Sequence, residues 1–189
     1  GSEMCIRDSP NEDPIKVIKK MKQTDNFKFD EANVMNELVY RNLSEDAKRQ
    51  ICAWKYGGEY ELYNLPAYEE MQVRQIGFMN PQREKNYYGF WDKSILVGFV
   101  NILEEKEEVF IGIGVNPDLC NKHYGQRMLL ITYEISKKLY PNKPLYLEVR
   151  TWNIRAVKCY QKAGFRIDGQ AYELTTGIGT GTFYRMIRE

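Results

Sequence analysis

Residues 109–125, VFIGIGVNPDLCNKHYG, decide the fold expected for this chain. They join an apolar run, a polar turn and the start of an amphipathic segment, which predicts a strand, a loop and a helix N-terminus in immediate succession. The first backbone N–H groups of a helix have no partner within it, and the helix dipole attracts an anion there. Gly125 lets the backbone approach a phosphate closely, and Lys122 adds positive charge. A diphosphate-binding loop is therefore expected.

Two glycines interrupt the predicted strand. Gly112 and Gly114 flank Ile113, and glycine inside a strand indicates a β-bulge or the close approach of a ligand backbone. A strand opened in this way leaves amides available to an extended ligand that carries amide groups. Taken alone, a glycine-containing strand-to-helix turn is equally typical of ordinary packing in α/β proteins.

A second segment, residues 145–165 (LYLEVRTWNIRAVKCYQKAGF), strengthens the functional interpretation. It predicts a strand and then a short helix that begins after an Asn153 N-cap and ends at Gly164. Ala156 is small where a ligand arm would pass. Tyr160 lies about two helical turns beyond Asn153 on the same face, where a phenol can protonate a leaving group. The alternative is that Tyr160 is a core-edge aromatic whose hydroxyl is satisfied.

The rest of the chain completes a single domain. Residues 1–36 are polar and lysine-rich and are interpreted as a leader and N-terminal arm, and residues 37–189 as the domain. The order of elements predicts a mixed α/β (α+β) sheet in which crossover helices link the later strands. Strands are expected at 37–43, 87–91, 95–103, 109–115 and 145–150, helices at 45–56, 66–80, 125–139 and 153–163, and two last strands around the turn 177–181.

Both motifs resemble those of one enzyme family. Asn153, Arg155-Ala156, Tyr160 and Gly164-Phe165 resemble the motif that ends the core of the GNAT N-acetyltransferases, and residues 116–128, NPDLCNKHYGQRM, resemble their acetyl-CoA loop. The resemblance covers about residues 37–188. It implies the GNAT acyl-CoA N-acyltransferase fold, a mostly antiparallel central sheet with one splayed parallel strand pair, flanked by helices. It also implies an acyltransferase that uses acetyl-CoA.

The resemblance assigns roles to particular residues. Asn153 and Ala156 would line the cleft for coenzyme A, and Tyr160 would protonate the departing sulfur. The pantetheine arm would be held by the peptide groups of Ile113, Gly114 and Val115. The diphosphate would be held by Asn121, Lys122, His123, Tyr124, Gly125, Gln126 and Arg127.

The loop departs from the family pattern at three positions. The family usually has Arg or Gln where Cys120 stands and Gly where Asn121 and His123 stand. Asn and His tolerate left-handed backbone angles better than most residues, so the loop is still expected to form. His123 is interpreted as a loop residue and not as a catalytic base. Because the thioester is already activated, covalent catalysis by a cysteine is not required.

Two carboxylates are candidates for the general base. Glu108 stands at the head of the strand that leads to the loop, but it also ends the charged run 104–108, which is typical of a solvated turn. Glu148 is the second candidate, with a salt-bridged strand residue as its alternative.

The acceptor is expected to be a small-molecule amine. Glu59, Tyr60, Tyr63 and Glu104 belong to acidic and aromatic stretches that would attract a cationic amine such as a polyamine or an aminoglycoside, and some GNAT proteins are aminoglycoside (antibiotic) resistance enzymes. One alternative stays open because the LEVR run, residues 147–150, also resembles bacterial enzymes that acetylate the N-terminal alanine of a ribosomal protein. Another is a sensor that binds CoA without turnover.

Composition excludes several other classes. A formal net charge of +1 argues against a general nucleic-acid binder. No run approaches the roughly 18 apolar residues of a membrane span. The four cysteines show no paired spacing, so we expect no metal site and reduced thiols in a cytoplasmic protein. Edge-strand pairing, or exchange of the last two strands, leaves a homodimer open.

Overall fold

The computed structural model describes residues 38–189. The predicted N-terminal arm lies outside the described residues. The strands of residues 38–189 are β1 (Val39–Asn42), β2 (Tyr87–Asp92), β3 (Ile95–Glu104), β4 (Val109–Val115), β5 (Leu145–Arg150), β6 (Arg166–Ile167), β7 (Tyr172–Thr176) and β8 (Gly179–Arg188). The α-helices are α2 (Glu45–Ala53), α3 (Tyr68–Arg74), α4 (Tyr124–Leu139) and α5 (Ile154–Lys162).

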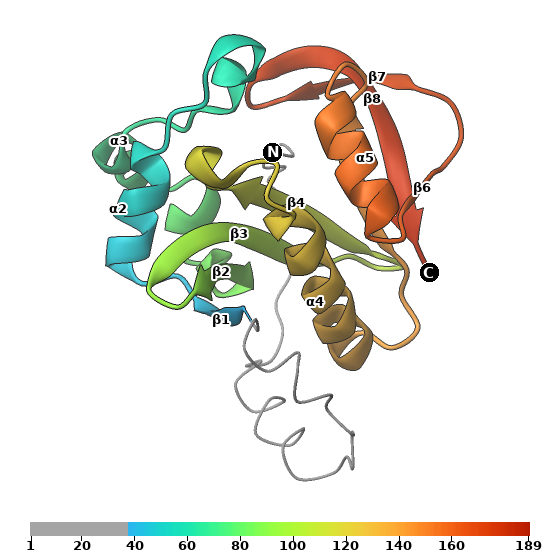
Figure 1. Ribbon diagram of the computed structural model, residues 1–189, viewed down its shortest axis with the longest axis horizontal. Coiled ribbons are helices and arrows are strands. Elements are labelled where there is room, and N and C mark those ends of the chain that lie inside the picture. The colour runs from blue at the N-terminus through green and yellow to red at the C-terminus, as the bar shows by residue number, and fades with distance from the viewer. Residues whose placement is uncertain (1–37) are drawn as a thin grey trace, which may run out of the picture.

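All eight strands form one mixed sheet (Figure 1). The order along it is β1-β2-β3-β4-β5-β8-β6, and β7 pairs with β8. Every pairing is antiparallel except that of β4 with β5, which is limited to Val109 with Leu145 and Phe110 with Tyr146. Beyond Phe110 the two parallel strands diverge. The fold class expected from the sequence, including the splayed parallel pair, is confirmed.

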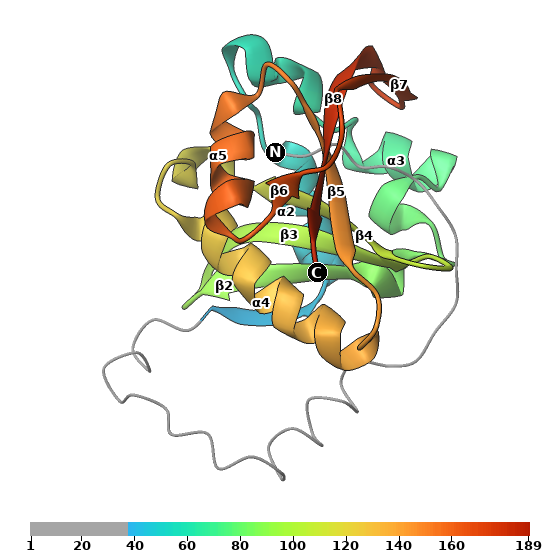
Figure 2. The same ribbon diagram turned by 90° about the vertical axis from the view of Figure 1, so that its right-hand side faces the viewer.

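The helices cover both faces of the sheet (Figure 2). Helices α4 and α5 bury Met128, Leu129 and Tyr160 against one face, together with Leu147 of β5. On the opposite face α2 and α3 form a second apolar cluster with β2 and β3. The crossover through α4 returns the chain parallel to β4, as the predicted βαβ order requires.

Helix α2 shows how the local sequence sets an element. Ser44 is its N-cap, and the Ser44 side chain accepts a hydrogen bond from the Ala47 backbone N–H. The helix ends at Ala53 and does not reach the expected stop at residues 57–58, because Trp54 is extended and turns its ring toward Phe99, with ring centroids 6.2 Å apart. Tertiary packing therefore shortens this helix.

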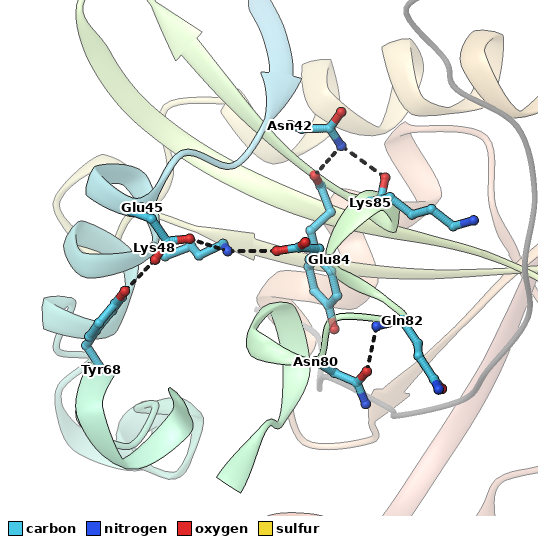
Figure 3. A network of polar contacts seen from close by, with 9 residues as sticks. Asn42, Glu45, Lys48, Tyr68, Asn80, Gln82, Glu84 and Lys85 are labelled. Carbon is cyan, nitrogen blue, oxygen red and sulfur yellow. Dashed lines mark hydrogen bonds and ion pairs between the residues drawn. The ribbon is translucent and has the colours of Figure 1, made fainter. Parts of the chain in front are cut away.

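A polar network ties α2 and α3 to the segment before β2 (Figure 3). Lys48, only 4% exposed, bridges Glu45 at 2.6 Å and Glu84 at 3.2 Å. The Tyr68 hydroxyl donates a hydrogen bond to Glu45. Acidic and aromatic side chains of this region thus stabilise the fold.

Of the two alternatives that the glycines of β4 suggested, a β-bulge or the close approach of a ligand backbone, the bulge is absent. β4 pairs with β3 in continuous register from Val109 to Val115, whereas the register shift of the sheet lies between Phe90 and Trp91 of β2. Gly114 has a packing role, since a Cβ atom built there would lie 2.5 Å from the Phe99 ring. β4 opens instead by diverging from β5.

The C-terminal hairpin is tighter than predicted. Thr176 pairs with Gly179 across the turn, so β8 already includes the residues at the end of the expected turn. The short strand β6 was not predicted, because two exposed residues carry no periodic pattern. Within residues 38–189, no helix has the length and apolar character required to cross a membrane.

Candidate active site

A cavity of about 270 Å³ opens where β4 diverges from β5, between α4 and α5. It brings together nine of the thirteen residues for which the sequence predicted cofactor contacts. These nine are Ile113, Val115, Asn121, His123, Tyr124, Gly125, Gln126, Ala156 and Tyr160. We refer to this space as the first cavity.

The N-terminus of α4 forms one wall of the first cavity. Asn121 and His123 adopt left-handed backbone angles, with φ of 63° and 62°, so the expectation that these two residues tolerate such angles is confirmed. No side chain caps this helix end within the described residues. A Cβ atom on Gly125 would lie 3.0 Å from the Cys159 sulfur, and its absence keeps the helix end open. Amide donors and a helix dipole therefore face this space, as an anion requires.

Helix α5 supplies the positive charge of the first cavity. Arg155, Lys158 and Lys162 all line it. The Arg155 nitrogen Nη2 is buried and has no hydrogen-bond partner in the described part of the chain, while the guanidinium stacks 4.0 Å over the Tyr60 ring. None of the three was predicted to contact the cofactor, although their spacing of three and four positions already indicates a common helix face. The cavity fits a polyanionic ligand such as the diphosphate of coenzyme A.

Tyr160 is the deepest candidate catalytic residue. It is 2% exposed, lies one turn beyond Ala156 on α5 and lines the first cavity. Cys120 and Cys159 line the same cavity, and neither was among the residues predicted to contact the cofactor.

Asn153 has a structural position at the start of α5. It is fully buried, its Oδ1 accepts a hydrogen bond from the Ala156 backbone N–H, and its Nδ2 donates to the Tyr63 hydroxyl at 3.3 Å. It does not line the first cavity. Its contact with a cofactor stays a prediction.

Replacing Asn153 with alanine is expected to lower the free energy of unfolding by about 1–2 kcal/mol, because the α5 cap is lost and a buried N–H loses its acceptor. Chemical denaturation measures the change. Asn153→Ser keeps a capping oxygen and is the matched control, which we expect to lose less stability. Equal stability of the wild-type and alanine proteins would contradict the assigned cap.

Three other predicted cofactor residues lie outside the first cavity. Lys122 is exposed at the loop, Arg127 stacks 5.4 Å from the Tyr124 ring, and Gly114 faces the opposite side of the sheet. Their cofactor contacts also stay predictions.

The structure contradicts the assignment of Glu108 as the base. Glu108 forms a double ion pair with Arg185. It lies five residues before Ile113 on an extended strand, which places it about 17 Å from that part of the cavity. Proton transfer requires hydrogen-bond reach, so Glu108 is structural.

The other two carboxylate candidates are also engaged elsewhere. Glu148 accepts a hydrogen bond from the Tyr172 hydroxyl at 2.9 Å and lines neither of the two cavities described here. Glu104 forms an ion pair of 2.5 Å with Lys143. It lies near the β3–β4 turn, at the same end of β4 as Glu108. Position in the sheet therefore removes Glu104 from the acceptor-binding residues.

A second cavity of about 180 Å³ lies on the other face of β4. Gly114 lines it, whereas its neighbours Ile113 and Val115 line the first cavity, because successive residues of a strand face opposite sides. Tyr56 also lines the second cavity, and its hydroxyl donates a hydrogen bond to the Val115 carbonyl at 2.6 Å. Burial raises the pKa of Tyr56 well above its usual value, so this donor stays protonated.

One of the predicted acceptor residues lines the second cavity, and the others lie outside both cavities. Tyr63 lines the second cavity. Tyr60 packs on Trp152, with centroids 5.7 Å apart, and lines neither cavity. Glu59 is exposed. The acidic residues that were expected to attract a cationic amine are therefore not among the residues that line the second cavity.

Comparison with known proteins agrees with this geometry. The model of the acetyltransferase (GNAT) family matches residues 43–165, so the chain belongs to this family. It is accordingly an acetyltransferase, with acetyl-CoA as its cosubstrate. Among curated proteins no similar sequence was found.

Solved structures share the fold at low sequence identity. The spermidine N-acetyltransferase of Vibrio cholerae in complex with CoA and spermine has a TM-score of 0.64 and 18% identity, covering 80% of this chain and 94% of that one. A GNAT-family acetyltransferase of Bacillus anthracis has a TM-score of 0.63 and 15% identity, covering 81% of this chain and 95% of that one. The aminoglycoside acetyltransferase AAC(6')-Ib in complex with coenzyme A has a TM-score of 0.62 and 18% identity, covering 80% of this chain and 94% of that one.

Proposed function

We propose that this protein transfers the acetyl group of acetyl-CoA directly to a primary amine held in the second cavity. One observation carries the proposal: the two cavities lie on opposite faces of β4, at the point where the strand diverges from β5. A cosubstrate on one face and an acceptor on the other would meet in this gap. Direct transfer then follows from proximity.

The first cavity would hold the cosubstrate by its charged parts. The α4 N-terminus and the basic face of α5 would bind the diphosphate, and Gly125 would allow its close approach. Bound acetyl-CoA supplies an activated thioester. Tyr160 would donate its phenolic proton to the departing sulfur.

The acceptor favoured by the sequence, a small cationic amine such as a polyamine or an aminoglycoside, is a candidate for this primary amine. Its support is that proteins of the same fold were solved with spermine and with kanamycin. Aromatic rings such as Trp54 and Tyr63 in the second cavity can also hold an ammonium group through cation–π contacts.

The proposal is tested by measuring thiol release from acetyl-CoA with a panel of primary amines and identifying the products by mass spectrometry. Acceptor-dependent release with an acetylated amine is the expected result. CoA binding without release for any small amine or N-terminal alanine peptide would contradict the proposal and favour a sensor.

A further inference from the structure

We infer that the acceptor is an amine with one positive charge and a flat apolar body, of the arylalkylamine type, in contrast to a polycation. The inference rests on the proposed function and names its substrate class. It is carried by the size, the wall and the charge of the second cavity.

Size limits the acceptor first. The second cavity measures about 180 Å³, and a protein cavity of about 150 Å³ accommodates benzene. One aromatic ring with a short aliphatic amine therefore fills it. A multi-ring aminoglycoside is far larger and would leave most of its polar surface outside.

The wall of the second cavity matches an aromatic ring. Trp54, Tyr56, Tyr63 and Phe99 line it on the face opposite α4 and α5. Trp54 and Phe99 are tilted by 34° to each other. An aromatic ring of the acceptor can pack on such rings in an offset-stacked or edge-to-face arrangement.

Charge excludes a polycation. No Asp or Glu is among the described residues that line the second cavity, and the charged residue that does line it is Arg74. Of the nearby carboxylates, Glu70 pairs with Arg74 itself at 2.8 Å, and Glu69 pairs with Arg49 at 3.3 Å. A second ammonium group on the acceptor would therefore find no carboxylate in the cavity wall to pair with, and burying an unpaired charge is unfavourable.

The apolar wall of the second cavity would also favour the neutral form of the acceptor amine, which is the form that reacts. Desolvation disfavours a charged ammonium and lowers its pKa, so the amine would lose a proton to water as it enters. The neutral nitrogen then attacks the acetyl carbonyl carbon, a C–N bond forms and the C–S bond breaks. Tyr160 gives its proton to the thiolate, and the second amine proton restores the phenol through solvent. No carboxylate base is needed, in agreement with the positions of Glu108 and Glu148.

The test compares kcat/KM for 2-phenylethylamine and tryptamine with that for spermidine and kanamycin, on the full chain. We expect the aromatic amines to be at least tenfold better. Comparable or better use of spermidine or kanamycin would overturn the inference and leave the proposed function standing. Absence of acetylation of every amine, with acetyl-CoA still bound, would overturn both.

A charge reversal gives an independent readout. Arg74→Glu is expected to raise the ratio of kcat/KM for spermidine to that for 2-phenylethylamine by about fivefold, a modest change because the Arg74 side chain is 55% exposed. Arg49→Glu is the matched control, since Arg49 is 56% exposed, is paired with a glutamate and does not line the second cavity. An equal change of the ratio in both variants would show a general surface effect and refute the role of Arg74.

Discussion

Replacing Tyr160 with phenylalanine is expected to lower kcat by about 100-fold, the scale of a lost general acid. The change removes one hydroxyl from a side chain that is 2% exposed and lines the first cavity, and it leaves the ring and its packing in place. Binding of CoA does not require this proton, so we expect its Kd to change by no more than about twofold. Steady-state kinetics and calorimetry measure the two quantities separately.

Tyr133→Phe is the control for this substitution. Tyr133 lies on α4, its hydroxyl donates to the Glu189 carbonyl at 2.7 Å, and it lines neither cavity. We expect its kcat to stay near the wild-type value. An unchanged kcat in Tyr160→Phe would remove Tyr160 as the acid, whereas a parallel loss of CoA affinity would indicate a binding role.

The second large effect concerns the N-terminus of α4. Gly125→Asp is expected to raise the Kd for CoA by about 100-fold, because it brings a carboxylate and a side chain to the place where the diphosphate would lie. The same negative charge interacts favourably with the helix dipole. We therefore expect Gly125→Asp to lose affinity for CoA without losing thermal stability. Calorimetry measures the affinity, and thermal melting measures the stability.

Gly125→Ala distinguishes shape from charge. Its Cβ atom would lie 3.0 Å from the Cys159 sulfur and 3.4 Å from Val115, contacts that a small shift of the flexible thiol relieves. We expect a loss of affinity well below that of Gly125→Asp. Equal losses would assign the effect to shape, and an undiminished affinity in Gly125→Asp would mean that the diphosphate binds elsewhere.

Local features of the sequence were sufficient for the main elements. The strand, loop and helix of residues 109–125 follow from apolar periodicity and from a turn in which Asn121 and His123 accept left-handed angles. β5 has the predicted bounds, and α5 begins after the predicted Asn153 cap. These signals depend on residues within a few positions of each other, so a single segment carries them.

The base was mispredicted because its partner lies far away in the chain. Glu108 and Arg185 are separated by 77 positions and meet only because β8 adds to the sheet beside β5. In the sequence, a charged run that forms structural ion pairs looks the same as one that offers a catalytic carboxylate.

The family, the order of the main elements and the loop that faces the first cavity could be predicted from the sequence, because motifs and backbone preferences act over short distances. The set of side chains that line the second cavity depends on how the chain folds in three dimensions. Its wall combines residues of α2, α3, β3, β4 and the turn after β7. These segments are far apart in the sequence and come into contact only when helices cover both faces of the sheet. A pattern within one segment does not predict such contacts.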